Sequence, residues 1–197
     1  FSFNAEPKTA KTIATDEKLI LHAPTRSAYG QLSTFISVIR RRSNKGHYNA
    51  ELKDFSFGLK GCIALWVPGQ QDIDSQVSLG AQIKTALPKL WLALELFHDG
   101  HDLDKTAHIL TLSSRLRLPI AATNNVHTHT RERQPLQDIV TAIRPKTTLQ
   151  ELGHRAFNNS ERTLRSLDQL ADIYPAELLN ETIHIADQCQ FNMSELR

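Results

Sequence analysis

The sequence has few cysteines and no long apolar run, and these absences exclude several classes of protein. Its 197 residues include only Cys62 and Cys189, with no Cys-x-x-Cys spacing, so neither a disulfide framework nor a structural zinc site is indicated. No apolar stretch approaches the roughly 20 residues that span a bilayer, and no charged-then-apolar signal pattern opens the chain. We therefore expect a protein of the reducing cytoplasm that makes no membrane contact.

Several catalytic and nucleotide-binding motifs are also missing. No Gly-x-Ser-x-Gly occurs and neither cysteine has a basic local setting, so a serine or cysteine nucleophile is unsupported. The pair Gly58 and Gly61 precedes an apolar run instead of following one, which excludes a phosphate-binding loop or a dinucleotide fingerprint there. The formal net charge of +2 neither requires nor excludes a nucleic-acid partner, because local basic patches matter more than the total.

Short apolar runs alternate with helical patterns along the first part of the chain. Residues 29–39 and 103–116 carry apolar side chains at helical spacing, which predicts amphipathic covering helices. The apolar runs are short and rich in aliphatic residues, as in buried strands, and they cover residues 18–21, 62–67, 91–96 and 118–122. This alternation indicates an α/β fold of about four parallel strands with covering helices.

The strand pattern ends near residue 125, and the rest of the chain is predicted to be helical. Helices are expected over 135–143, 166–173 and 175–189, with Pro135 and Pro175 at first-turn positions where proline is favourable. We divide the chain into βα units over residues 1–144 and a helical cap over residues 145–197. Both parts are treated as one domain.

A metal-capable cluster follows the last predicted strand. His127 and His129 are two residues apart on an extended segment, which places both imidazoles on the same side, and neutral imidazole is a common metal ligand. In α/β proteins the carboxyl ends of strands carry the chemistry. The alternative is that the two histidines lie on a polar loop and bind nothing.

The same region carries a collinear series of motifs. ATNNVHTHTRERQPLQDIVTAIR (122–144) is followed by TTLQELG, by ERTLRS from Glu161, by YPAELLNETIHIADQC from Tyr174 and by FNMSELR at the end. Upstream, LILHAPTRSAYGQLSTFI and the basic stretch RRRSNKGHY precede them. In order and spacing this series resembles the PHP (polymerase and histidinol phosphatase) region of bacterial C-family DNA polymerases, the DNA polymerase III alpha-subunit family, and most closely its error-prone branch.

The resemblance implies a fold, a parent enzyme and a set of partners. It implies the second half of a distorted β/α barrel followed by a helical carboxyl-terminal segment. The parent would be an error-prone DNA-directed DNA polymerase for translesion, damage-induced synthesis, with DNA and dNTPs as partners, other DNA-repair proteins beside them, and Mg²⁺ held by carboxylates beyond Arg197. The chain opens on Phe1-Ser2-Phe3, and the family's PHP region begins earlier, so we expect a fragment whose upstream metal motifs lie before Phe1.

The resemblance also identifies metal ligands and a departure from them. His127 and His129 correspond to the family's His-x-His turn. The family also has a metal-binding histidine close to the Glu-Leu that ends the strand matching LWLALEL, and here Phe97 intervenes, so either His98 fills that role after a one-residue shift or the ligand is lost. Glu95, Asp99 and His101 are further potential ligands. Asn125 stands where the family has Asp, and a neutral amide supplies no charge to a divalent cluster. We therefore expect weak or incomplete metal occupancy.

Two functions follow from these residues. In the first, the PHP region chiefly supports the polymerase structurally and carries no polymerase catalytic residue. In the second, His127, His129 and His98 hold metal ions that activate water in a metal-dependent phosphoesterase or nuclease.

The basic run Arg40 to Arg42 also has two explanations. It is either a solvated helix end, favoured there by the helix dipole, or a contact to DNA phosphates together with Lys45.

Overall fold

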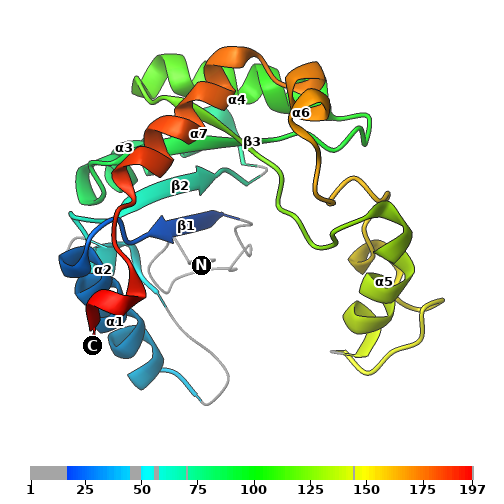
Figure 1. The fold of residues 1–197 in the computed structure, drawn as a ribbon, viewed down its shortest axis with the longest axis horizontal. Helices are drawn as coiled ribbons and strands as arrows, with labels where there is room; N and C mark the ends of the chain where they lie inside the picture. Colours follow the sequence, from blue (N-terminus) through cyan, green and yellow to red (C-terminus); the bar gives the residue numbers. More distant parts are fainter. Residues whose placement is uncertain (1–16, 45–49, 56–57, 70, 144, 197) are drawn as a thin grey trace.

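Four strands form one open sheet. The computed structural model describes residues 17–44, 50–55, 58–69, 71–143 and 145–196 (Figure 1). The strands lie side by side in chain order, and they are β1 (Lys18–His22), β2 (Ile63–Val67), β3 (Leu90–Glu95) and β4 (Ile120–Thr123). All four predicted apolar runs are therefore strands. Among the described residues β1 and β4 are the edges of the sheet, and the half-barrel remains a prediction.

The direction of β1 corrects the expectation of four parallel strands. β1 pairs with β2 antiparallel, with Lys18 opposite Val67 and His22 opposite Ile63, whereas β2, β3 and β4 are parallel to one another. Two helices, α1 (Arg26–Arg41) and α2 (Leu52–Phe55), separate β1 from β2. The chain therefore returns to the end of the sheet that it left. Apolar periodicity reports that a strand is buried but carries no information on its direction, so the sequence pattern could not reveal this.

One face of the sheet packs on three helices. α1, α3 (Ile73–Ala86) and α4 (Asp102–Leu116) all contribute to the main core, which joins them to the strands through Leu19, Trp66, Leu92, Ile83 and Leu112. The fit of α3 on the sheet requires glycine, because a Cβ at Gly80 would lie 2.6 Å from Cζ3 of the Trp66 ring. α2 and α3 were not individually predicted.

The other face of the sheet is covered from the carboxyl-terminal part of the chain. α7 (Ala176–Gln188) places Ile185 against Ile63, Leu65, Ala93 and Ala121 in a second, smaller core, and Figure 1 shows it crossing the strands. The predicted helices after residue 125 are thus confirmed as α5 (Gln134–Ile143), α6 (Leu167–Ile173) and α7. Short 3₁₀ turns cover Arg131–Arg133, Gly153–Arg155 and Met193–Leu196. The division near residue 144 stays a prediction, and Arg144 itself lies outside the described residues.

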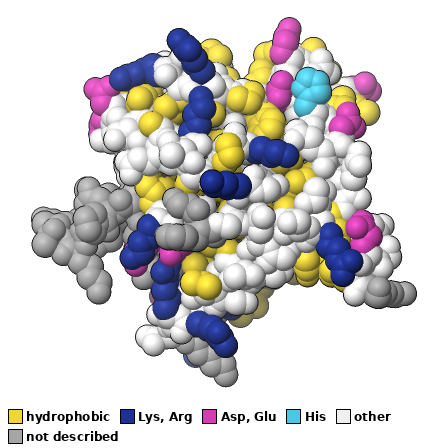
Figure 2. Space-filling view, turned by 90° about the vertical axis from the view of Figure 1, so that its left-hand side faces the viewer, with side chains coloured by type: hydrophobic (Ala, Val, Ile, Leu, Met, Phe, Trp, Pro, Cys, Tyr) yellow, Lys and Arg dark blue, Asp and Glu magenta, His cyan; other side chains and the backbone are white. Residues whose placement is uncertain are grey.

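The basic end of α1 is partly neutralised within the chain. Arg40 and Arg41 form the last turn of α1, and Arg42 pairs with Asp54 of α2. Lys45 lies outside the described residues. On the face drawn in Figure 2, lysine and arginine side chains occupy several separate places with hydrophobic side chains between them. None of the described helices is both long enough and apolar enough to cross a membrane.

Candidate functional site

The carboxyl edge of the parallel strands gathers the residues that the sequence singled out. Glu95 ends β3 opposite Thr123 of β4, and the chain continues from β4 into Asn125 and His127. Because β1 is antiparallel, its first residue, Lys18, also lies at this edge. Sequence reasoning missed Lys18, since it assumed the opposite strand direction.

A later segment of the chain folds over the His-x-His turn. Thr128 forms an isolated bridge with Thr163, and the Leu164 N–H donates to the Thr128 carbonyl at 3.1 Å. Thr128 is buried, whereas His127 and His129 on either side of it are exposed. The expected placement of both imidazoles on one side of the segment stays a prediction.

Glu95 is a partly buried carboxylate at this edge with several charged neighbours. Burial raises the pKa of its carboxyl group, and the charges of Arg162, Lys18 and Lys105 with a hydrogen bond from Asn125 partly oppose that rise. Asn125 has a left-handed backbone, φ 43°, a conformation that asparagine tolerates better than most residues. The Asn125 amide is thus a hydrogen-bond partner of Glu95.

His127 sits in a cationic environment. Although the residue is exposed, partial desolvation of the ring lowers the pKa of its imidazole, and the positive charges of Arg162 and Lys18 lower it further. The ring meets Phe157 edge-on, with 4.7 Å between centroids. A neutral imidazole is therefore favoured at this position.

The turn between β3 and α4 uses its acidic side chains for its own structure. The Asp102 carboxylate accepts the N–H groups of Phe97 and His98, at 3.1 and 2.8 Å. Asp99 accepts the Lys105 ammonium at 2.7 Å and the His101 N–H at 3.1 Å. Although burial opposes ionisation of Asp99, these hydrogen bonds lower the pKa of its carboxyl group. Both carboxylates are therefore committed to local partners.

The donor set fits a metal ion poorly. Within the described part of the chain, no group of three or more His, Cys, Asp or Glu side chains is arranged to hold a metal ion. His98 is exposed on a turn with φ 51°, and His129 is also exposed. The assignment of His127, His129 and His98 as ligands stays a prediction.

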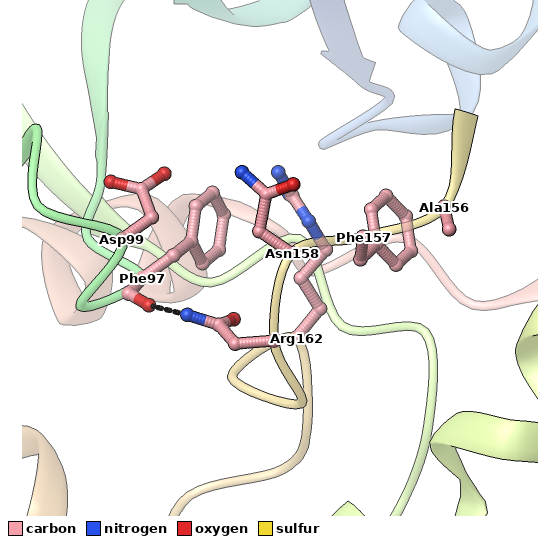
Figure 3. A pocket seen from close by; sticks show the side chains of 7 residues that line it. Phe97, Asp99, Ala156, Phe157, Asn158 and Arg162 are labelled. Carbon is pink, nitrogen blue, oxygen red and sulfur yellow. Dashed lines mark hydrogen bonds between the residues drawn. The ribbon is translucent and has the colours of Figure 1, made fainter. Parts of the chain in front are cut away.

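A small hollow of about 200 Å³ opens beside this edge. Figure 3 shows its walls, which are Phe97, Asp99, Ala156, Phe157, Asn158, Asn159 and Arg162. The Asn159 side chain donates to the Phe97 carbonyl at 2.7 Å and fixes the 156–163 segment on the β3 turn.

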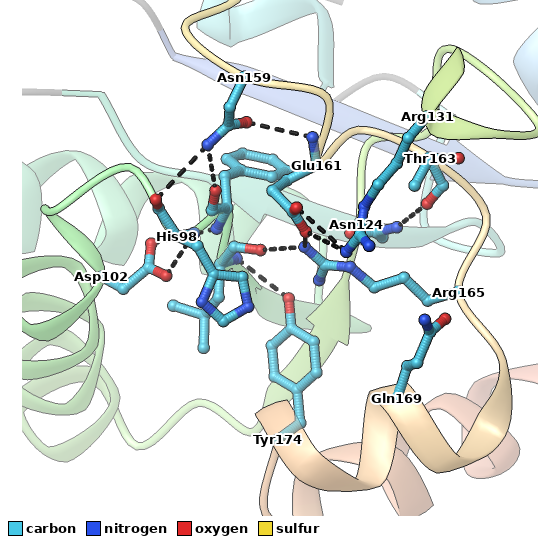
Figure 4. Close-up of polar contacts among 12 residues, drawn as sticks. His98, Asp102, Asn124, Arg131, Asn159, Glu161, Thr163, Arg165, Gln169 and Tyr174 are labelled. Atoms are coloured by element: carbon cyan, nitrogen blue, oxygen red, sulfur yellow. Dashed lines mark hydrogen bonds and ion pairs between the residues drawn. The ribbon is translucent and has the colours of Figure 1, made fainter. Parts of the chain in front are cut away.

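A buried polar cluster around Arg165 and Tyr174 bonds to the ends of the strands at this edge (Figure 4). The Arg165 side chain is only 1% exposed, and its Nη2 donates to the Leu96 carbonyl at 3.0 Å and to Glu161 at 3.2 Å. The Tyr174 hydroxyl accepts the Leu96 N–H at 3.0 Å and donates to the Thr123 carbonyl at 2.8 Å. No local pattern marks Arg165 as buried, so sequence reasoning could not find this cluster.

The chain is similar to error-prone DNA polymerases. It is 44% identical to that of Methylococcus capsulatus over 91% of this chain, and 39% identical to those of Dechloromonas aromatica and Pseudomonas fluorescens over 91% and 94%. It spans only 17–18% of the length of these curated relatives. No protein-family model matches the chain. The resemblance seen in the sequence is confirmed, and the chain is homologous to one segment of these polymerases.

Proposed function

We propose that this chain, a homologue of one segment of error-prone DNA polymerases, is part of such an enzyme and forms the carboxyl-terminal part of its PHP region. The observation that carries the proposal is 44% identity over 91% of the chain. The parent would join dNTPs to a DNA primer and copy damaged templates in the cytoplasm. Its Mg²⁺ would be held by carboxylates outside this segment, together with the residues that bind the primer and template.

The role of this segment within the enzyme is chiefly structural. The acidic side chains at the sheet edge bind partners within the chain. Asp102 accepts a backbone N–H of the turn after β3, and Asp99 accepts a hydrogen bond from Lys105. Glu161 forms ion pairs with Arg131 and Arg165. Such internal pairing fixes loops and leaves few free groups for chemistry. The βα units and the helical cap together support the rest of the polymerase structurally.

Primer extension by the full-length protein that contains this chain tests the polymerase proposal. With Mg²⁺ and dNTPs it should extend a primer past an abasic site, and it should leave a mismatched 3′ end in place. Failure to incorporate nucleotides even on an undamaged template would overturn the proposal.

A metal-dependent phosphoesterase is the second candidate, because His127 and His129 are both exposed in the turn that follows β4. In that case the His129→Ala variant should lose about a hundredfold or more of the hydrolysis of an aryl phosphodiester. Under the structural role the same variant should extend primers at the wild-type rate, and the wild-type protein should show no hydrolysis that depends on His129.

A further inference from the structure

Arg162 is fixed to the predicted metal residues by its backbone. Its carbonyl accepts the N–H of His127 at 2.8 Å and the N–H of Thr128 at 3.2 Å. The segment that carries Arg162 is therefore held against the His-x-His turn, although 35 positions separate it from His127 in the sequence (162 − 127).

The Arg162 side chain is clamped between two aromatic rings. Its guanidinium carbon lies 3.7 Å from the centroid of the Phe97 ring and 4.5 Å from that of Phe157. Its Nη1 is buried and has no hydrogen-bond partner among the described residues. An arginine held in this way keeps its charge at a defined place, because stacking restricts the side chain and arginine does not deprotonate.

The charge of Arg162 acts on the carboxylate at the strand edge. Arg162 and Lys18 both interact electrostatically with Glu95, as does Lys105. Lys105 forms a direct ion pair with Asp99 at 2.7 Å, whereas Arg162 interacts electrostatically with both Glu95 and Asp99, and no direct ion pair of its guanidinium is found among the described residues. A partly buried carboxylate needs such compensation.

A divalent ion would meet unfavourable conditions at the same place. The charges of Arg162 and Lys18 repel it, Asn125 contributes no negative charge, and Asp99 is paired with Lys105. A metal site needs several anionic or imidazole ligands that converge on one point. The nearby cations and the incomplete ligand set therefore both disfavour a bound metal ion here.

We propose that the guanidinium of Arg162, with the ammonium of Lys18, supplies the positive charge that a metal ion would supply beside Glu95 and His127. The sheet edge is then held together by protein cations and needs no metal. This inference rests on the structural role proposed above and gives it a physical basis.

Hydrogen exchange in the full-length protein tests the inference. The readout is the peptide covering residues 124–131, which contains the His127 and Thr128 amides that bond to Arg162. Exchange is measured by mass spectrometry in EDTA and with Mn²⁺ or Zn²⁺ alone, without DNA or dNTPs, together with the bound metal per protein. In the wild-type protein the metal should leave exchange unchanged, within about twofold.

Two substitutions separate charge from packing. Arg162→Met keeps an apolar chain between the phenylalanines but removes the charge, and it should raise exchange of the peptide about tenfold. Glu95→Gln added to Arg162→Met should restore much of the protection, because the uncompensated carboxylate is gone. The matched control is Arg133→Met, since Arg133 is exposed and no side-chain hydrogen bond or ion pair to it is found in the described residues.

Three results would overturn the inference. The first is a metal ion that slows wild-type exchange about tenfold and is lost from a His127→Ala variant. The second is unchanged exchange in Arg162→Met, and the third is the absence of rescue by Glu95→Gln. If Arg162→Met does not fold, the wild-type metal comparison decides alone. Primer extension by the same preparation is read separately, so an inactive polymerase with metal-independent exchange would overturn only the function proposed above.

Discussion

At the scale of single residues, the Tyr174 hydroxyl connects two neighbouring strand ends. It accepts the Leu96 N–H after β3 and donates to the Thr123 carbonyl at the end of β4, and the residue is 2% exposed. Tyr174→Phe should lower the free energy of unfolding by about 1–3 kcal/mol, because a buried N–H and a partly buried C=O both lose a partner. Urea denaturation measures the loss.

Tyr29→Phe is the matched control for this substitution. The Tyr29 ring lies 5.2 Å from that of Phe191, and no hydrogen bond to its hydroxyl is found in the part of the chain that the structure describes. Its effect should stay within about 0.5 kcal/mol. Equal losses in the two variants would mean that the Tyr174 hydroxyl contributes nothing specific.

His22 gives the fold a pH dependence. Burial lowers the pKa of its imidazole from the ordinary value of 6.5, and Nε2 has no partner among the described residues. In acid the unfolded chain therefore takes up a proton more readily than the folded chain, so stability present above pH 6.5 is lost as the pH falls. His22→Gln should reduce the loss of unfolding free energy between about pH 7.5 and 5.5.

The urea midpoint at several pH values measures this loss, with His101→Gln as the control because His101 is exposed. A His22→Gln profile parallel to that of the wild type would show that other groups cause the pH dependence.

At the scale of elements, α7 belongs to the core although the sequence suggested only a cap. Ile185 is 7% exposed in the second core, and Glu181 accepts the Trp91 indole N–H of β3 at 2.8 Å. Ile185→Ala should cost about 2–4 kcal/mol of unfolding free energy, since it leaves a cavity against the strands. Ile183, 56% exposed on the same helix, is the control, and Ile183→Ala should cost less than about 1 kcal/mol. Similar costs for both would mean that α7 is not anchored through Ile185.

The positions of the strands and helices were easier to predict from the sequence than the residues that the fold brings together. Apolar alternation located all four strands and the pattern after residue 125 located α5, α6 and α7, because burial leaves a periodic trace in the sequence. The direction of β1 and the position of Lys18 leave no such trace. The same is true of Arg162, which reaches the His-x-His turn only through the fold. The sequence thus predicted Glu95, Asn125 and His127 at one edge but not the cations beside them.

At the scale of the whole molecule, α5 is the element least integrated with the rest. Figure 1 shows it to one side of the sheet, and its apolar side chains are largely exposed: Leu136 51%, Ile139 45%, Val140 54% and Ile143 67%. The amphipathic pattern of α5 therefore predicted the helix correctly, while its apolar face meets no core within the described residues. An exposed apolar surface of this kind favours association.

Expressed by itself, the 197-residue chain should self-associate. In the described part of the chain, the outer edges of β1 and β4 pair with no further strand. Unpaired edges favour association, as the exposed apolar face of α5 does. Size-exclusion chromatography with light scattering should show oligomers whose share rises with protein concentration. The double variant Val140→Lys/Ile143→Lys should reduce that share without lowering stability, because both side chains are already exposed. A monodisperse wild-type monomer that melts in one cooperative transition would contradict the expectation, since it would mean that the edges and α5 are satisfied within the chain.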